Sequence, residues 1–174
     1  MNAHDEVQLW HALYRLEARY WHEVDSNCGR NAHEFYVPDG LMVVGHNHFE
    51  GREKIREYYA WRQRQVTTGI CSQTTRHLIS NLFIESCDGW CVKVMGIVSF
   101  YGASGRPPAP QSKPPILVAD LINECILDDE SGWQFKSHTL QPVFMSHEAP
   151  PSIAIDTHRV GHRIPTAGRD RPLR

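Results

Sequence analysis

His77 and Asp25 are the residues of this sequence whose types and positions best suit acid–base chemistry. His77 lies in segment 74–85, which alternates like a half-buried strand and places it on one face with Ile79 and Phe83. Both faces of this segment carry apolar residues, so we expect both to be covered. Burying an imidazole without a partner costs roughly 1–3 kcal/mol. His77 therefore needs a hydrogen-bond partner or a chemical function. Its possible function depends on Asp25, which ends the first predicted helix.

The composition narrows the possible partners. A chain of 174 residues suits one domain, and 18 Lys and Arg against 20 Asp and Glu give a formal charge of −2. This charge predicts neither nucleic acid nor an anionic membrane as a partner. There is no run of about 18 apolar residues, and the N-terminus lacks a signal-peptide pattern, so we expect a cytoplasmic protein. Five cysteines without a paired C-x-x-C pattern argue against a disulfide framework and a zinc ribbon.

Hydrophobic periodicity predicts helices first and long strands afterwards. Apolar residues recur at helical spacing from Val7 to Val24, and the segment Asp25–Gly29 stops this helix. We expect a turn at Pro38–Gly40 and an extended proline-rich loop at 102–115 that could cover a pocket. The other predicted helices cover 31–36 and 51–65, and the predicted strands cover 41–44, 71–85, 90–101, 116–127 and 133–145, with a turn or short strand at 45–49.

This order of elements predicts an α+β fold in which N-terminal helices wrap a strongly curved, antiparallel or mixed sheet. A curved sheet forms a cone, and the open end of a cone is a natural pocket for a small molecule. We assign residues 1–146 to this domain and 147–174 to a C-terminal tail.

Several short motifs support the same fold: Tyr20-x-x-x-x-Asp25, Phe35–Gly40, Gly51–Ile55, Thr75–Asn81 and Gly132–Phe135. Their order and spacing resemble the SnoaL-like family of the nuclear transport factor 2-like superfamily, over roughly residues 5–145. The resemblance implies a cystatin-like α+β barrel. It does not specify the reaction, because this scaffold supports dehydratases, isomerases, polyketide cyclases, epoxide hydrolases, oxygenase small subunits and adaptors.

The resemblance also implies roles for individual residues. Scytalone dehydratase, bile acid 7α-dehydratase and hexachlorocyclohexane dehydrochlorinase carry an aspartate and a histidine as an acid/base pair, and Asp25 and His77 match those positions. Tyr20 looks like the tyrosine of ketosteroid isomerase that donates to the substrate oxygen. No carboxylate stands at Val43 or Val44, where the base of the isomerase would be sought. Steroid-type isomerisation is therefore disfavoured.

Four further residues are expected to contact the substrate. Asn123 stands roughly where the isomerase has its second acid, and it would either orient a substrate oxygen or pair with strand edges. Trp21 lies beside the apolar stripe of the first helix, and Tyr59 lies on the inner side of the 51–65 helix. Phe83 is expected on the same strand face as His77.

These residues predict a cofactor-independent lyase, most simply a dehydratase that acts on a hydrophobic cyclic or aromatic metabolite. The carboxylate of Asp25 would fix the tautomer of His77 and stabilise the imidazolium that forms when the ring takes a proton. His77 or Tyr20 would then assist the departure of water. Neither a metal nor another cofactor is required, and His46-Asn47-His48 has no third ligand near in sequence.

Two alternatives remain open. The Asp25–His77 pair could simply join helix to sheet, as in ring-hydroxylating oxygenase small subunits, which resemble the same Arg-His-x-x-Ser-Asn pattern and have no active site of their own. The protein would then be such a subunit, and a trimer, or it would be a ligand carrier. A polyketide cyclase, isomerase or epoxide hydrolase would differ in reaction rather than in pocket. For the enzyme we expect a homodimer formed through the exposed face of the sheet.

Overall fold

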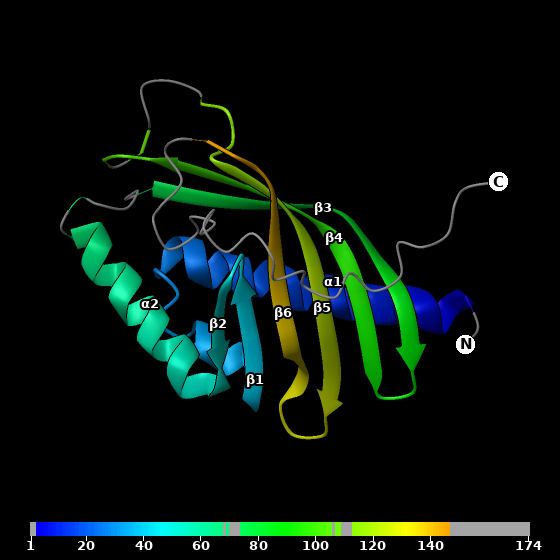
Figure 1. The fold of residues 1–174 in the computed structure, drawn as a ribbon. Coiled ribbons are helices and arrows are strands. Elements are labelled where there is room, and N and C mark those ends of the chain that lie inside the picture. Colours follow the sequence, from blue (N-terminus) through cyan, green and yellow to red (C-terminus); the bar gives the residue numbers. More distant parts are fainter. Residues whose placement is uncertain (1–2, 68, 70–73, 106, 109–112, 147–174) are drawn as a thin grey trace.

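A computed structural model of the protein describes residues 3–67, 69, 74–105, 107–108 and 113–146. It confirms the predicted α+β class, with two α-helices, one short 3-10 helix and a six-stranded curved sheet within these residues (Figure 1). The predicted tail at 147–174 lies outside the described residues. In chain order the elements are α1 (Ala3–Ser26), η1 (Ala32–Phe35), β1 (Tyr36–Val44), β2 (Asn47–Glu50), α2 (Gly51–Thr67), β3 (Thr74–Asp88), β4 (Cys91–Ala103), β5 (Leu117–Asp128) and β6 (Gly132–Met145).

Helix α1 forms where the apolar stripe predicts it and ends just after Asp25. Leu13, Tyr20 and Val24 are buried along this stripe and pack into the core. The chain leaves the helix through a left-handed turn in which Gly29 has a φ of 71°. A Cβ at Gly29 would lie 2.2 Å from the Tyr59 ring, so only glycine fits there. This fixed end of the helix determines where the Asp25 side chain lies.

The sheet has the strand order β2-β1-β6-β5-β4-β3, so β3 forms one edge. β1 and β6 are parallel, and all other neighbouring strands are antiparallel. Figure 1 shows α1 lying across one face of the curved sheet and α2 lying beside β1 and β2. Helix α1 packs against β3 and contacts β6. The sheet edge that carries His77 therefore faces the C-terminal half of α1.

The predicted turn at Pro38–Gly40 is wrong, because these residues belong to β1. The strand pairing shifts between Tyr36 and Leu41, so the chain passes through this segment with an irregularity in its ladder. Proline lacks the N–H that a regular ladder needs and is tolerated at such irregularities. The short helix expected over 31–36 is a 3-10 turn that ends at Phe35.

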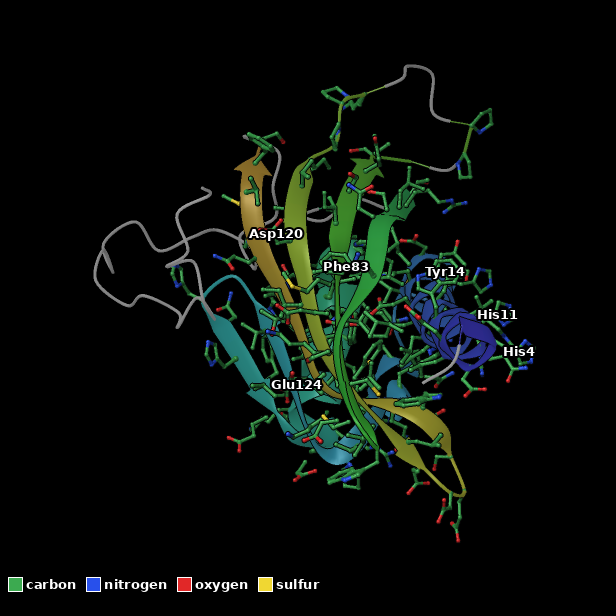
Figure 2. The ribbon with its side chains drawn as sticks, turned by 90° about the vertical axis from the view of Figure 1, so that its right-hand side faces the viewer. His4, His11, Tyr14, Phe83, Asp120 and Glu124 are labelled. Atoms are coloured by element: carbon green, nitrogen blue, oxygen red, sulfur yellow. The ribbon has the colours of Figure 1, made fainter. Side chains whose placement is uncertain are left out.

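The predicted placement of Phe83 on the His77 face is also wrong. Asn81 has a φ of 53°, and the pairing of β3 with β4 shifts between Ser80 and Phe83. Such a bulge resets the alternation of the strand. Beyond it Leu82 packs against the core, whereas Phe83 is 51% exposed. Figure 2 shows Phe83 on β3, with His4, His11 and Tyr14 on the α1 side and Asp120 and Glu124 on the other.

Two further observations concern the described residues. Cys28, Cys87, Cys91 and Cys125 are all free thiols. Cys87 pairs with Val92 rather than with Cys91 across the β3–β4 ladder, so these two thiols do not stand opposite each other. Neither helix of the described chain has the length and apolar character needed to cross a bilayer.

Candidate functional site

The structure brings Asp25 and His77 into direct contact across the junction of α1 and β3. The ring Nδ1 of His77 lies 2.7 Å from Oδ1 of Asp25. The backbone N–H of His77 donates to Oδ2 at 2.8 Å, and the Thr75 hydroxyl donates to Oδ1 at 2.9 Å. Both side chains of the pair are 9% exposed. Because the Asp25 carboxylate accepts a hydrogen bond from Nδ1–H of His77, the other ring nitrogen, Nε2, is the basic one in the neutral ring.

Two aromatic rings fix the plane of the His77 imidazole. Trp21 stacks on it with a centroid distance of 4.3 Å and an interplanar angle of 17°. Phe100 stacks on it at 4.7 Å and 14°. Trp21 is in place because it lies one helical turn before Asp25, and Phe100 because it pairs with His77 across β3 and β4. With both faces covered, the ring can meet another molecule only along its edge.

Burial is the largest influence on the protonation of both partners. It lowers the pKa of His77 below its ordinary value, against the raising effect of the hydrogen bond and charge of Asp25. Burial alone would raise the pKa of Asp25, but the hydrogen bonds from His77 and Thr75 and the His77 charge outweigh it and lower that pKa. At neutral pH Asp25 is therefore ionised and His77 is neutral. A neutral imidazole is the form that can accept a proton.

A cavity of about 550 Å³ lies beside the pair, within the range of small-molecule sites. Helix α1 contributes Tyr14, Trp21 and Asp25 to its wall, and β3 contributes His77 and Ile79. Pro107, in the segment predicted to form a proline-rich loop, also lines the cavity. The cavity lies between α1 and the β3 edge of the sheet, so the site is built from the edge strand.

The comparisons with known proteins bear on the fold. No protein-family model and no curated protein sequence matches this chain. Among solved structures, a candidate scytalone dehydratase from Novosphingobium aromaticivorans is 18% identical with a TM-score of 0.65, over 83% of this chain and 89% of that chain. A nuclear transport factor 2-like protein with a cystatin-like fold from the same organism is 16% identical with a TM-score of 0.61, over 80% and 84% of the two chains.

The fold is that of the nuclear transport factor 2-like proteins. A third structure of this kind, a candidate aromatic ring hydroxylase from the same organism, is 16% identical with a TM-score of 0.61, over 79% of this chain and 91% of that chain. At these identities the likeness establishes the architecture. The chemistry of the chain must be argued from its own residues.

Tyr20 and Tyr59 lie inside the nuclear transport factor 2-like core rather than in the wall of the cavity that His77 lines. Their hydroxyls are 2.5 Å apart, and Tyr36 donates to Tyr20 at 3.0 Å. Tyr20 is 1% exposed, and burial raises the pKa of both phenols well above the ordinary value. The structure therefore does not bring Tyr20, the predicted substrate donor, or Tyr59, a predicted substrate contact, to the cavity that His77 lines.

Asn123 is also buried and away from that wall. Its side-chain amide donates to Glu17 Oε1, and its carbonyl accepts the backbone N–H of Thr139 at 3.3 Å. The alternative in which Asn123 serves a structural role fits this position better than the predicted substrate contact. Of the four residues expected to touch substrate, the cavity wall includes Trp21.

Sequence reasoning missed three residues of this region. Thr75 lies two positions before His77, so strand alternation could have placed both on the Asp25 side. Tyr14 lies seven residues before Trp21, the repeat of one helix face, and it lines the cavity. Glu17 lies within the buried stripe of α1, where a carboxylate is unusual.

The described residues contain no group of three or more histidine, cysteine, aspartate or glutamate side chains arranged to hold a metal ion. His46 and His48 flank the start of β2 and form no such group with their described neighbours.

Proposed function

We propose that this protein is a cofactor-independent lyase, a dehydratase in which His77 is the general base and Asp25 its counter-charge. The observation that carries the proposal is the hydrogen bond from His77 Nδ1 to an ionised Asp25 at the wall of a cavity. This bond leaves Nε2 as the proton acceptor, and the positive charge formed on the ring is neutralised by the carboxylate. The apolar part of the wall favours a hydrophobic cyclic or aromatic substrate.

The reaction follows from these groups. Nε2 of His77 takes the proton from the carbon next to a substrate carbonyl, and the electron pair of that C–H bond forms the new C=C bond. The C–O bond at the neighbouring carbon breaks, and the leaving hydroxyl takes the proton from His77, so water departs and the base is regenerated. We assign the hydrogen bond to a substrate oxygen to Tyr14, which lines the same wall. In this proposal Tyr14 has the role of substrate donor that the sequence analysis predicted for Tyr20.

The experiment is proton exchange in heavy water with cyclic β-hydroxy ketones that carry an aromatic ring. We expect the wild-type protein to introduce deuterium next to the carbonyl and to release water. His77→Gln should lower both rates by about 10²–10⁴-fold, the usual contribution of a general base. His48→Gln, on the distant strand β2, is the matched control and should behave like the wild type. Equal rates for wild type and His77→Gln on a turned-over substrate would reject the proposal.

One observation favours a non-catalytic alternative. Asp25 accepts hydrogen bonds from His77 and Thr75 and thereby ties the end of α1 to β3. Such a joint would serve a small oxygenase subunit or a ligand carrier equally well. That alternative gains support if the protein purifies as a trimer with an iron-containing partner chain, and no substrate exchange is then expected.

We also propose that the enzyme is a homodimer formed through the outer face of the sheet. Phe83 is a large apolar residue exposed on β3 beyond the bulge at Asn81, and exposed apolar surface favours association. Phe83→Lys should shift the protein from dimer to monomer in sedimentation velocity. A wild-type protein that is monomeric at all concentrations would contradict this proposal.

A further inference from the structure

A second carboxylate–imidazole pair, Glu17 with His138, lies in the core behind the candidate site. The Glu17 residue is 1% exposed and His138 is fully buried. Oε2 of Glu17 lies 3.5 Å from Nε2 of His138, a distance longer than a normal hydrogen bond. The other ring nitrogen of His138, Nδ1, has no hydrogen-bond partner among the described residues. The lyase mechanism proposed above uses neither residue.

The groups around Glu17 are hydrogen-bond donors. Trp21 donates its indole Nε1–H to Oε2 at 3.1 Å, and Asn123 donates its amide to Oε1. Trp21 Nε1–H can only donate, and both oxygens of the Glu17 side chain can accept. One carboxylate oxygen of Glu17 therefore holds Trp21, and the other holds Asn123.

Glu17 is linked to the candidate base, His77, through the indole ring of Trp21. Trp21 is fixed at Nε1 by Glu17, and the flat face of its indole lies on the imidazole of His77 at 4.3 Å. Phe100 closes the opposite face of the imidazole. If the indole were free to tilt, the imidazole would lose one of the two surfaces that hold its plane. The alignment of Nδ1 with Asp25 would then loosen.

We propose that Glu17 is a positioning residue for His77 and acts through Trp21. The catalytic meaning of this role rests on the proposed function, but the contact chain from Glu17 to Trp21 to His77 exists without it. Stability alone does not explain a carboxylate at this position. Replacing buried charged groups with apolar residues of similar volume is often neutral or stabilising. Glu17 instead supplies a directional acceptor that a leucine could not provide.

The test is nuclear magnetic resonance of His77 in the ligand-free protein, which needs no substrate. The measured quantity is the rate at which the His77 Nδ1 proton exchanges with water. Trp21 and Asn123 donate to different oxygens of the carboxylate, and glutamine has an NH₂ group in place of one of them, so Glu17→Gln loses one of the two hydrogen bonds. We expect this exchange to become about tenfold faster or more, because loss of one hydrogen bond changes an equilibrium by about that factor.

Two further variants make the result decisive. Ile55→Val removes one methylene from the buried face of α2, which contributes none of the hydrogen bonds or stacked rings that join Glu17, Trp21 and His77, and it lowers stability. It should leave the exchange rate within about twofold of the wild type, well under the tenfold of a lost hydrogen bond. Trp21→Phe keeps an aromatic ring but removes the donor to Glu17, and should accelerate exchange as Glu17→Gln does. It also decides the question if Glu17→Gln does not fold.

The outcomes separate this inference from the proposed function. Exchange in folded Glu17→Gln and Trp21→Phe that equals the wild-type rate would overturn the positioning role. An acceleration that Ile55→Val reproduces would overturn it too, because general destabilisation would then explain it. If exchange accelerates as expected but His77→Gln retains full turnover, the positioning role stands and the lyase assignment fails.

Discussion

Two carboxylate–imidazole pairs share Trp21 in this protein, and they differ in nearly every physical respect. Asp25 and His77 lie at a cavity wall, 2.7 Å apart. Glu17 and His138 lie in the core, 3.5 Å apart, and the imidazole has no good hydrogen bond. The first pair is close, well satisfied and next to space for a ligand. The second is loose and closed off, and its carboxylate is mainly an acceptor for Trp21 and Asn123.

The difference shows that the same two side-chain types take their roles from their surroundings. A proton-transfer pair needs a ring nitrogen that a substrate can reach and a carboxylate that is ionised. The pair at the cavity meets both conditions. The buried pair cannot be reached, so it affects the chemistry only through the groups that it holds in place. Changes to the inner pair should therefore lower stability and loosen the position of His77, and changes to the outer pair should mainly lower activity.

The largest expected effect separates the two pairs by stability. Glu17→Ala should lower the free energy of unfolding by about 3–5 kcal/mol, because it leaves the buried donors of Trp21 and Asn123 without an acceptor, at about 1–3 kcal/mol each, and opens a cavity. Asp25→Ala leaves donors near a solvent-connected cavity and should cost about 1–3 kcal/mol. Urea unfolding followed by circular dichroism measures both. The reverse order would contradict the different roles of the two pairs.

A second prediction concerns the rate. Asp25→Asn keeps a side-chain oxygen for the Nδ1–H of His77 but removes the negative charge that stabilises the imidazolium. Because the charge of Asp25 raises the pKa of His77, the variant should have a still lower His77 pKa and a rate reduced by about 10²-fold. Heavy-water exchange and a histidine titration measure the two effects. Asp39→Asn, at an exposed site in β1, is the control, and an unchanged rate in Asp25→Asn would leave Asp25 as a structural residue.

A third prediction concerns pH. The folded state lowers the pKa values of both His77 and Asp25, so the unfolded chain binds more protons in acid. The stability that His77 contributes is complete above its unfolded pKa of about 6.5 and is lost as the pH falls through its folded value. The contribution of Asp25 is lost only below about pH 4. Urea midpoints measured across this range should fall with falling pH.

His77→Gln isolates the histidine part of that profile. The variant should remove a slope of at most about 1.4 kcal/mol per pH unit just below pH 6.5, the largest slope that one proton can produce. The loss of stability below about pH 4, which comes from the protonation of carboxylates, should persist in this variant. A wild-type profile that is flat between about pH 7 and 5 would contradict the lowered pKa of His77.

The smallest expected effect tests one hydrogen bond at the cavity. Thr75→Val removes a donor to Asp25 and should cost about 1 kcal/mol. It should also raise the pKa of Asp25, because the Thr75 hydroxyl lowers that pKa. Thr75→Ser keeps the hydroxyl and is the matched control. A carboxyl titration followed by nuclear magnetic resonance should show a higher value in Thr75→Val than in Thr75→Ser.

Local patterns in the sequence predict much of the fold. The apolar stripe of α1 and the alternation of β4, β5 and β6 are periodic over many residues, so their helical and strand character follows directly. The resemblance to known enzymes suggested Asp25 and His77, and the structure places them in contact. The physical reason is that Asp25 lies at the end of a long helix and His77 near the start of a long strand. The backbone positions of both residues are fixed by these regular elements.

The remainder depends on contacts that a local pattern does not contain. Tyr20 has the helical spacing of a core residue, and only the fold shows that Tyr36 and Tyr59 satisfy its hydroxyl. Glu17 and His138 are far apart in sequence, so their proximity follows from how α1 crosses β6. The backbone turn at Asn81 reverses the faces of the residues from Leu82 to Ile84, before the pairing shifts again between Ile84 and Ser86, and periodicity alone cannot reveal either shift.

The bulge at Asn81 also bears on solubility, because β3 is an edge of the sheet. An edge strand presents unpaired backbone groups that can recruit a strand from another molecule and seed aggregation. A bulge twists such an edge away from a flat template, and Asn81 places this break after the residues that hold the imidazole. Straightening the strand by deleting Asn81 should therefore leave His77 in register while making the protein prone to form fibrils.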